Sequence, residues 1–298
     1  MQKLTKNLHL HLMLLPSVIA VFIFSYIPMA GIVIAFQKFV PAKGYILNQQ
    51  FIGFENFRYI LLMPNIYGVL RNTITIALGK IVLYIIVPIV VALLLNEVVH
   101  LKFKRAIQTM IYFPYFLSWV VFAGVLVDIL SVKTGIFNDL LEFLGLGRHF
   151  FLGDNSLFQG TLIVTESYKT FGFDTVIFLA AITNIDPALY EAAAIDGAGR
   201  FKQTLHITLP GMFMMIVLVI VINMGNVMNA GFDQIFNLYS PAVYKSGDVL
   251  DTLIYRIGLI DFHYGPATAV GLFKSLVSMI LISGSYFVSY KFFDYRIF

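Results

Sequence analysis

Four residues with polar or aromatic side chains follow one another at helical spacing inside an otherwise apolar stretch. Glu166, Lys169, Thr170 and Phe173 occupy positions i, i+3, i+4 and i+7, which predicts that they share one face of a helix. Charged side chains are unfavourable in hydrocarbon, so this face is expected to line a path for a polar solute. The alternative is that Glu166 and Lys169 only neutralise each other.

Asparagines recur three residues apart farther along the chain, at Asn223, Asn226 and Asn229. An asparagine side chain both donates and accepts hydrogen bonds, which suits the hydroxyl groups of a sugar. Buried asparagines also form contacts between helices. We give the two roles equal weight for Asn226 and Asn229, and favour the contact role for Asn223.

Two aromatic residues and three charged residues complete the set of candidates. Tyr115 and Trp119 are at i and i+4, where their rings could stack on pyranose faces or belong to the aromatic belt of a membrane interface. Lys80 and Lys274 interrupt apolar stretches. They could offset an anionic substrate, but snorkelling or pairing with a partner subunit is favoured. Asp174 is expected on a helix face buried in protein.

Motifs for catalysis, metal binding and nucleotide binding are absent from the sequence. The chain has no cysteine, and none of its six histidines is placed for a metal site, since His9 and His11 have no third ligand nearby. No G-x-x-x-x-G-K-[ST] motif occurs, so the chain cannot hold ATP phosphates itself. No block of basic residues indicates nucleic acid. We therefore predict no catalytic residue, no metal and no cofactor in this chain.

The elements that position these residues are predicted to be membrane spans. Hydrophobic residues make up 59% of the 298 residues and charged residues 12%, whereas soluble domains contain about 25% charged residues. A helix needs roughly 20 apolar residues to cross a bilayer. The sequence thus predicts an all-α membrane protein, one domain over residues 1–298, with six transmembrane helices at 12–36, 72–95, 106–130, 157–183, 211–232 and 267–290.

The orientation of these spans follows from the basic residues in their connections. Lys and Arg are about twice as dense on the side that holds both ends of the chain (Lys3, Lys6, Lys291 and Arg296) and segment 184–210. Both termini are therefore predicted to be cytoplasmic. The long outer connections are each expected to contain a short amphipathic helix, at 51–57 and at 137–146.

Segment 184–210, between the fourth and fifth predicted spans, has an unusual composition. Asp186 and Pro187 are typical of the first positions of a helix, and the alanine-rich residues 188–195 favour helix strongly. Gly197 and Gly199 are expected to end it with a sharp turn. A second short helix is predicted from Arg200 to the vicinity of residue 210. The small alanines would let a partner approach closely, although an ordinary well-capped loop helix is the alternative.

This segment resembles the permease subunits of binding-protein-dependent ABC importers. It matches their E-A-A-x3-G-x9-I-x-L-P signature at seven positions, Glu191, Ala192, Ala193, Gly197, Ile207, Leu209 and Pro210. Leu15-Pro16, Tyr26-Ile-Pro28 and residues 52–57 resemble the opening of carbohydrate permeases of that family. The subgroup to which the chain is most similar imports oligosaccharides of acidic polysaccharides such as alginate or rhamnogalacturonan.

The resemblance implies a role for each part of the segment. Glu191 would contact an arginine of a separate ATPase, Ala192 and Ala193 would pack closely against it, and Gly197 would form the turn. It also implies a second homologous permease, two ATPase subunits that bind ATP and Mg, an extracytoplasmic solute-binding protein and an oligosaccharide substrate. Import would occur by alternating access across the cytoplasmic (inner) membrane of a bacterium.

Two other classes compete with this interpretation. A stand-alone secondary transporter or channel for a small polar solute would also have several spans and intramembrane charges, but no inverted repeat is evident in the sequence. A membrane-embedded enzyme would need a catalytic motif such as H-E-x-x-H or G-x-S-x-G, and neither occurs.

Overall fold

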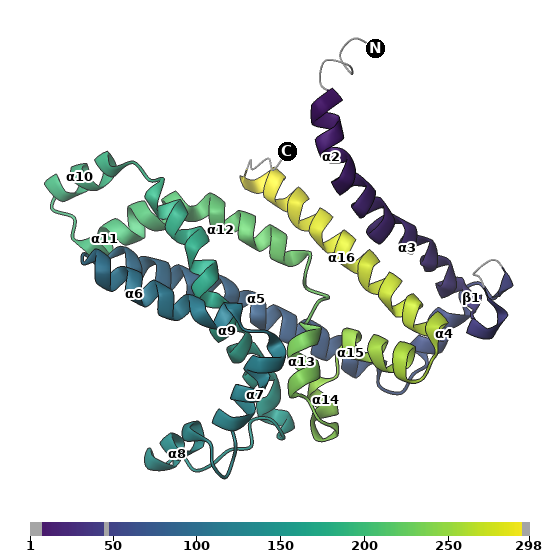
Figure 1. Cartoon of the computed structure of the whole chain (residues 1–298). Coiled ribbons are helices and arrows are strands. Elements are labelled where there is room, and N and C mark those ends of the chain that lie inside the picture. The colour runs from purple at the N-terminus through teal and green to yellow at the C-terminus, as the bar shows by residue number, and fades with distance from the viewer. Residues whose placement is uncertain (1–7, 45–47, 294–298) are drawn as a thin grey trace. The chain divides into compact units, whose positions relative to one another are not determined.

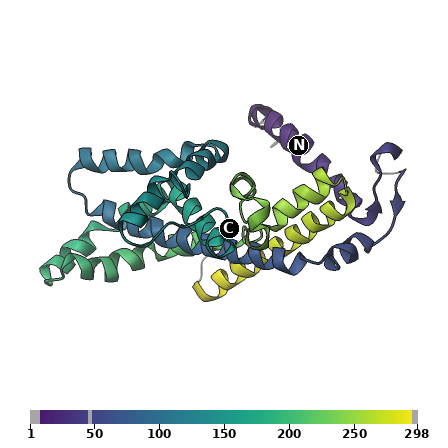
Figure 2. The ribbon, with the colours of Figure 1, turned by 90° about the horizontal axis from the view of Figure 1, so that it is seen from below.

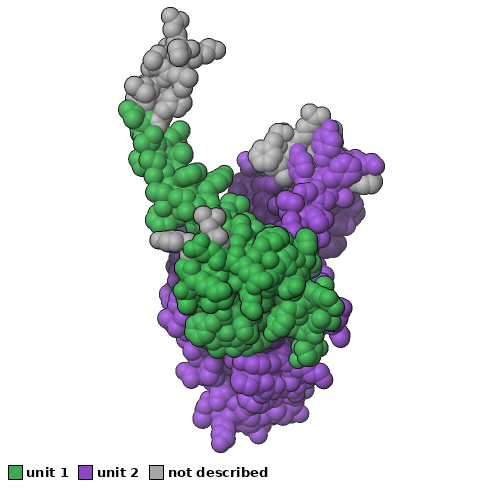
Figure 3. All heavy atoms as spheres, turned by 90° about the vertical axis from the view of Figure 1, so that its right-hand side faces the viewer, with its two compact units in different colours: residues 1–66, 254–273 green, residues 67–253, 274–298 purple. Residues whose placement is uncertain are grey.

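The computed structural model of the chain describes residues 8–44 and 48–293. It divides into two compact units, residues 1–66 with 254–273 and residues 67–253 with 274–298, which Figure 3 shows in different colours. Lys3, Lys6 and Arg296, which contribute to the predicted orientation, lie outside the described residues.

The first unit consists of a long N-terminal helical segment followed by short elements. Its elements are α2 (Leu8–Val21), η1 (Phe22–Tyr26), α3 (Ile27–Met29), η2 (Ala30–Phe36), β1 (Gln37–Lys38), η3 (Pro41–Lys43), β2 (Gln50–Phe51), α4 (Glu55–Leu61), η8 (Arg256–Ile260) and the first turns of α16 (Tyr264–Phe293). β1 and β2 pair antiparallel, with Gln37 opposite Phe51. The side chain of Asn56 donates hydrogen bonds to the carbonyls of Ala35 (2.9 Å) and Gln37 (3.0 Å), and so satisfies the end of the helical segment.

The predicted amphipathic helix at 51–57 begins later than expected. Phe51 is in β2, and the chain turns at Gly53 with a φ of 61° before α4 starts at Glu55. A positive φ is readily adopted only by glycine, and the strand therefore ends here. The helix predicted at 137–146 is present as α8 (Ile136–Phe143).

The second unit contains the remaining elements. They are α5 (Ile66–Asn96), α6 (Leu101–Tyr112), η5 (Phe113–Phe116), α7 (Trp119–Ile129), α8, α9 (Asn155–Thr183), α10 (Pro187–Ile195), α11 (Arg200–Gln203), η6 (Thr204–Thr208), α12 (Leu209–Met224), α13 (Phe232–Leu238), η7 (Pro241–Val243), α14 (Tyr244–Gly247), α15 (Leu250–Tyr255) and the rest of α16. Helices α10 and α11 lie at one end of α12, and α13 and α14 lie beyond its other end (Figures 1 and 2).

The described chain has four helices that are long and apolar enough to cross a membrane, and up to six spans if each bent pair counts as one. The four are Leu12–Phe36, Ile66–Asn96, Arg200–Met224 and Tyr264–Lys291, and the bent pairs are Leu101–Phe116 with Trp119–Ile129 and Asn155–Thr183 with Pro187–Ile195. The chain is therefore a mostly helical membrane protein.

One predicted span is bent, and two predicted helix boundaries are wrong. The span at 106–130 is bent by 105° between residues 116 and 119, where the Ser118 side chain accepts a hydrogen bond from the Val121 amide and caps a new helix. The span at 211–232 ends at Met224. The helix that begins at Arg200 does not end near Pro210 but continues into α12. Pro210 is tolerated because the wider π turn η6 directly precedes α12 and absorbs the missing hydrogen bond.

Two buried clusters hold the second unit together. One joins α5, α7 and α9 to α13, and its largest members include Ile76, Phe122, Phe158 and Ile235; the other joins α5, α9 and α12 around Phe178 and Met212. Close packing rather than transfer out of water stabilises helices within a bilayer. Such packing is visible at Gly172, where a Cβ atom would lie 2.0 Å from the carbonyl oxygen of Ile111 in α6.

Amide side chains fix the segment around α14 at one end of the second unit. Asn72 donates to the carbonyls of Lys245 (3.0 Å) and Asp248 (3.1 Å), and Gln159 donates to the Ser246 carbonyl at 2.9 Å. Asn155 accepts from the amide of Ser246 at 3.1 Å. Asn155 is the first residue of α9 and Asn72 lies in the second turn of α5, so the segment around α14 packs against the N-terminal ends of both helices.

Candidate functional site

A cavity of about 190 Å³ lies within the second unit, between α5, α9 and the chain that follows α12. It is lined by Ala77, Lys80, Ile81, Tyr84, Glu166, Ser167, Thr170, Asn223, Asn226, Asn229, Ala230 and Gly231. Amides, hydroxyls and one pair of opposite charges alternate with apolar groups along the wall. This is the composition of a site that orients a polar ligand by a few hydrogen bonds.

Lys80 is the centre of the polar wall. Its ammonium donates to Glu166 Oε2 at 2.9 Å, to the Ala230 carbonyl at 2.6 Å and to Gln234 Oε1. The side chains of Lys80 and Glu166 are 12% and 23% exposed, so this is a partly buried ion pair. Of the two alternatives for Glu166, mutual neutralisation with Lys169 has no ion pair to support it, because Glu166 pairs with Lys80 instead. Lys80 thus has its counter-charge within its own chain.

The residues around Lys80 are fixed by a second layer of contacts. Gln234 is fully buried, and its amide nitrogen donates to the Leu162 carbonyl at 2.7 Å and to Thr165 Oγ1 at 2.8 Å. Gly231 has a φ of 91°, and a Cβ there would lie 2.8 Å from Lys80 Nζ. Only glycine fits this combination of backbone conformation and close approach.

The three asparagines line the same cavity. Because α12 ends at Met224, only Asn223 is helical, and its side chain donates to the Val219 carbonyl at 2.8 Å. This bond is to the backbone of α12 itself, so the contact between helices favoured for Asn223 stays a prediction. Asn226 and Asn229 follow in successive turns and are exposed to the cavity. Within the described residues neither of their side chains has a hydrogen-bond partner.

Lys169 and Phe173 lie apart from Glu166 and Thr170, in contact with Tyr115. The rings of Tyr115 and Phe173 stack at 4.2 Å with an angle of 6°, and Lys169 Nζ donates to the Tyr115 carbonyl at 2.9 Å. The same ammonium lies 5.4 Å from the Tyr115 ring centroid and 5.5 Å from that of Trp119. The four residues thus lie on one face of the continuous helix α9, but Glu166 and Thr170 line the cavity whereas Lys169 and Phe173 contact Tyr115 of η5. The ring of Phe173 therefore covers one face of the Tyr115 ring.

Several residues at this site were not identified from the sequence. Tyr84 lies one turn after Lys80 in α5, a spacing that predicts a shared face, and Ser167 and Gln234 carried no comparable signal. Asp174, predicted to be buried, is 4% exposed. The second intramembrane lysine, Lys274, forms an ion pair with Asp251 of α15, so it also finds its partner within the chain.

The predicted coupling segment has the local structure that its sequence indicates. Asp186 accepts a hydrogen bond from the Ala188 amide at 2.9 Å and caps α10. At the other end Gly197 has a φ of 74°, and the Ala198 amide donates to the Ala193 carbonyl at 2.8 Å, which together form a Schellman motif. Glu191 and Ala192 are exposed, whereas Ala193 is half-buried.

The signature's last residues belong to the long helix, where a side-chain contact ties them to α10. Ile207 and Leu209 are half-buried, and Pro210 is exposed. Between them, Thr208 Oγ1 lies 3.0 Å from the hydroxyl of Tyr190. The surface of this segment also presents apolar side chains, with Ile195 86% exposed and Phe201 80% exposed. Exposed apolar groups of this size are typical of a surface that contacts a membrane or a protein partner.

Comparisons with known proteins identify the family. Residues 85–297 match the family model described as "Binding-protein-dependent transport system inner membrane component". The chain is 36% identical to Protein LplB of Bacillus subtilis (strain 168), over 98% of this chain and 92% of that protein. It is 38% identical to the Polygalacturonan/rhamnogalacturonan transport system permease protein YteP of the same organism, over 94% of this chain and 87% of that protein.

A solved structure gives the same answer. A chain from the crystal structure of a bacterial ABC transporter involved in the import of the acidic polysaccharide alginate matches with a TM-score of 0.89 and 35% identity, covering 98% of both chains. These relatives are transport permeases and not enzymes, in agreement with the prediction for this chain. The resemblance of residues 184–210 is thus confirmed, and the chain belongs to the family of binding-protein-dependent transport system inner membrane components.

Proposed function

We propose that this chain is one transmembrane subunit of an ATP-driven importer that moves oligosaccharides across the cytoplasmic membrane by alternating access. The observation that carries the proposal is the exposed, capped helix α10 with Glu191 on its surface, at the end of the unit away from α14. The chain has no nucleotide-binding motif, so ATP and Mg would be bound by two separate ATPase subunits. A second permease and an extracytoplasmic binding protein would complete the complex.

The relatives support the substrate class and one of the partners. The name of one relative describes transport of polygalacturonan and rhamnogalacturonan. Another matched structure, at a TM-score of 0.88 and 35% identity, is of an alginate ABC transporter in complex with a periplasmic protein bound to an alginate pentasaccharide. A stand-alone secondary transporter is not favoured, because these relatives act within binding-protein-dependent systems.

The proposed topology has six spans in one domain, with both termini and segment 184–210 in the cytoplasm. Segment 184–210 meets the connection between α5 and α6 at one end of the second unit, where Arg200 Nη1 pairs with Glu97 Oε2 at 2.8 Å. Predicted outer segments meet at the other end, around Asn72 and Asn155. This agreement between charge bias and contacts supports the orientation.

Cysteine labelling tests the topology directly, because the native chain has no cysteine. A membrane-impermeant maleimide should label Lys133→Cys in intact spheroplasts, and should label Asp196→Cys only after permeabilisation. Labelling of Asp196→Cys in intact spheroplasts would contradict the orientation.

The role of α10 is tested by charge reversal. In the complex reconstituted with its binding protein and oligosaccharide, Glu191→Lys should abolish substrate-stimulated ATP hydrolysis, because a lysine would repel the arginine expected on the ATPase. Asp128→Lys, at the exposed end of α7 on the opposite side of the membrane, is the matched control and should retain stimulation. Normal stimulation in Glu191→Lys would sink the coupling role.

The substrate path is proposed to include the cavity, with Asn226 and Asn229 as the groups that contact sugar hydroxyls, beside Glu166 and Thr170. The double variant Asn226→Ala/Asn229→Ala should lower oligosaccharide uptake, while the ATPases remain coupled to the permease. Unchanged uptake kinetics would remove both asparagines from the path. Tyr115, Trp119, Lys169 and Phe173 would form the adjoining wall.

A further inference from the structure

We propose that Lys80 is a positioning residue that holds the asparagine-bearing segment 226–231 in place, and that it does not bind a carboxylate of the substrate. The cavity would then recognise a sugar through its hydroxyl groups and be indifferent to the charge of the sugar. This inference rests on the proposed function, since it concerns how the importer's cavity selects its oligosaccharide.

The ammonium of Lys80 has no hydrogen left to donate to a substrate. A lysine ammonium has three hydrogens. Here three acceptors use them, namely Glu166 Oε2 at 2.9 Å, the Ala230 carbonyl at 2.6 Å and Gln234 Oε1. A substrate carboxylate would have to displace one of these acceptors, and each displaced group would be left in a largely buried site.

The three acceptors of Lys80 belong to three different parts of the unit. Glu166 is on α9, Gln234 is on α13, and the Ala230 carbonyl belongs to the irregular chain between α12 and α13. Lys80 itself is on α5, so its three bonds connect four segments at one point. Gln234 is held with its oxygen toward Lys80, because its amide nitrogen donates to Leu162 and Thr165 on the opposite side.

The chain that carries the asparagines turns close to Lys80. It reverses at Gly231, whose φ is 91°, and a Cβ atom at this position would lie 2.8 Å from Lys80 Nζ. Asn226 and Asn229 are in the six residues before this turn and line the cavity. Since their side chains have no hydrogen-bond partner among the described residues, their position depends on the backbone that Lys80 holds.

The charges of the residues that line the cavity balance each other. Among the lining residues only Lys80 and Glu166 are charged, and they cancel each other; the other polar groups are amides and hydroxyls. Asp174, buried beside Tyr84 and Thr170, is a carboxyl group and supplies no cation. Lys169 does not line the cavity, and its ammonium is bonded to the Tyr115 carbonyl. A uronate entering this cavity therefore meets no free cation.

The test compares Lys80→Met with wild type in the reconstituted transporter, using two probes of one skeleton. The probes are trigalacturonate and its fully methyl-esterified, uncharged form, each loaded on saturating binding protein. Because a small displacement of binding groups lowers the rate steeply, uptake of both should fall by a similar factor, between about tenfold and a hundredfold. A loss confined to the acidic probe would overturn the proposal.

A second readout does not depend on the substrate. Hydrogen exchange of residues 225–238, measured on the purified complex, should become faster in Lys80→Met and remain as in wild type in Asn226→Ala. Gln234→Met is a second variant, useful because Gln234 does not line the cavity and cannot contact substrate. It should reproduce both effects of Lys80→Met.

The matched control is Lys274→Met, which removes the other intramembrane lysine, paired with Asp251. Exchange in 225–238 should be unchanged there. Unchanged exchange in both Lys80→Met and Gln234→Met would overturn the positioning role. If wild type imports neither trisaccharide, the oligosaccharide function fails, and the exchange experiment still decides the role of Lys80.

Discussion

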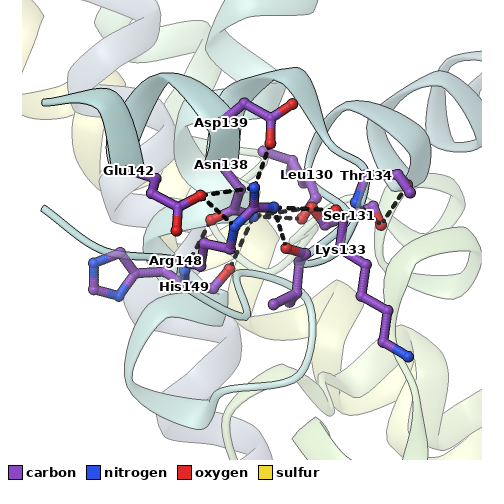
Figure 4. Close-up of polar contacts among 10 residues, drawn as sticks. Leu130, Ser131, Lys133, Thr134, Asn138, Asp139, Glu142, Arg148 and His149 are labelled. Atoms are coloured by element: carbon purple, nitrogen blue, oxygen red, sulfur yellow. Dashed lines mark hydrogen bonds and ion pairs between the residues drawn. The ribbon is translucent and has the colours of Figure 1, made fainter. Parts of the chain in front are cut away.

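Two cations of this chain, Lys80 and Arg148, each bond to carboxylate and carbonyl oxygens, one in a largely buried cluster and the other in an exposed one. Lys80 meets one carboxylate, one carbonyl and one side-chain amide around the cavity. Arg148 meets the carboxylates of Asp139 (2.6 Å) and Glu142 (2.8 Å) and the carbonyls of Val132 and Lys133 (Figure 4). The side chain of Lys80 is 12% exposed, whereas the two carboxylates around Arg148 are more than half exposed.

The difference shows where a charge is indispensable. In segment 131–154 the buried hydrogen-bonding side chain is neutral. Asn138 is fully buried and donates to the carbonyls of Leu130, Ser131 and His149. Water can replace the partners of an exposed cation, but not those of a buried one. The cavity instead has a buried ion pair. Its lysine connects more segments than a neutral amide would, and so holds the path in one arrangement.

The largest contrast is expected from removing one carboxylate at each place. Glu166→Ala leaves Lys80 partly buried without its counter-charge, and should lower the free energy of unfolding by about 3–5 kcal/mol. Glu142→Ala should have a small effect, because Asp139 and water remain beside Arg148. Thermal unfolding of the purified complex measures both. Equal shifts in the two variants would show that burial does not distinguish the clusters.

The parts of the fold and of the candidate site that depend on neighbouring residues could be predicted from the sequence. Asp186, Pro187 and Gly197 predicted the start and end of α10, because capping and positive-φ turns depend on neighbouring residues. Glu166, Thr170, Asn226 and Asn229 were also identified, since polar residues in apolar stretches stand out by composition alone; their functional roles stay predictions.

The contacts that define the site could not be predicted, because their partners are distant in sequence. Lys80 and Glu166 are 86 residues apart, and periodicity gives no information on which helix meets which. The interruption of the span after Met224 was missed because residues 217–228 are almost uniformly apolar apart from the asparagines. Gly225 and Gly231 were the available signals, and the left-handed turn at Gly231 shows their meaning.

Gly231→Ala tests the buried cluster from the backbone side. An added Cβ would press on Lys80 and hold an unfavourable φ, at about 1–3 kcal/mol, and should lower uptake together with stability. Gly160→Ala is the control, because that glycine is inside α9 with no atom within 4 Å of its added Cβ. Thermal unfolding of Gly160→Ala should be unchanged or slightly improved, since alanine favours helix. Comparable losses in both variants would contradict the role of the turn.

Asn138→Ala tests whether the neutral amide supports segment 131–154. Three carbonyls would lose their donor in a buried place, which should destabilise the segment by about 1–3 kcal/mol. Limited proteolysis between residues 131 and 154 should become faster, with oligosaccharide uptake affected less than in Gly231→Ala. Asn237→Ala, which removes one hydrogen bond within α13, is the control. Unchanged proteolysis in Asn138→Ala would place the stability of the segment elsewhere.

The smallest effect is expected for Arg148→Met, and its dependence on pH and salt is the sharpest check. Hydrogen bonds to Glu142 and Asp139 raise the pKa of Arg148 above its ordinary value. A raised pKa stabilises the folded protein fully below the ordinary value, and the stabilisation is lost only as pH rises through the folded value. The small difference in melting temperature from wild type should therefore be constant between roughly pH 6 and pH 9 as far as Arg148 itself is concerned. It should shrink with added salt, because these charges are exposed to water. A large difference that salt does not reduce would mean that Arg148 acts like Lys80, and the contrast between the two clusters would fail.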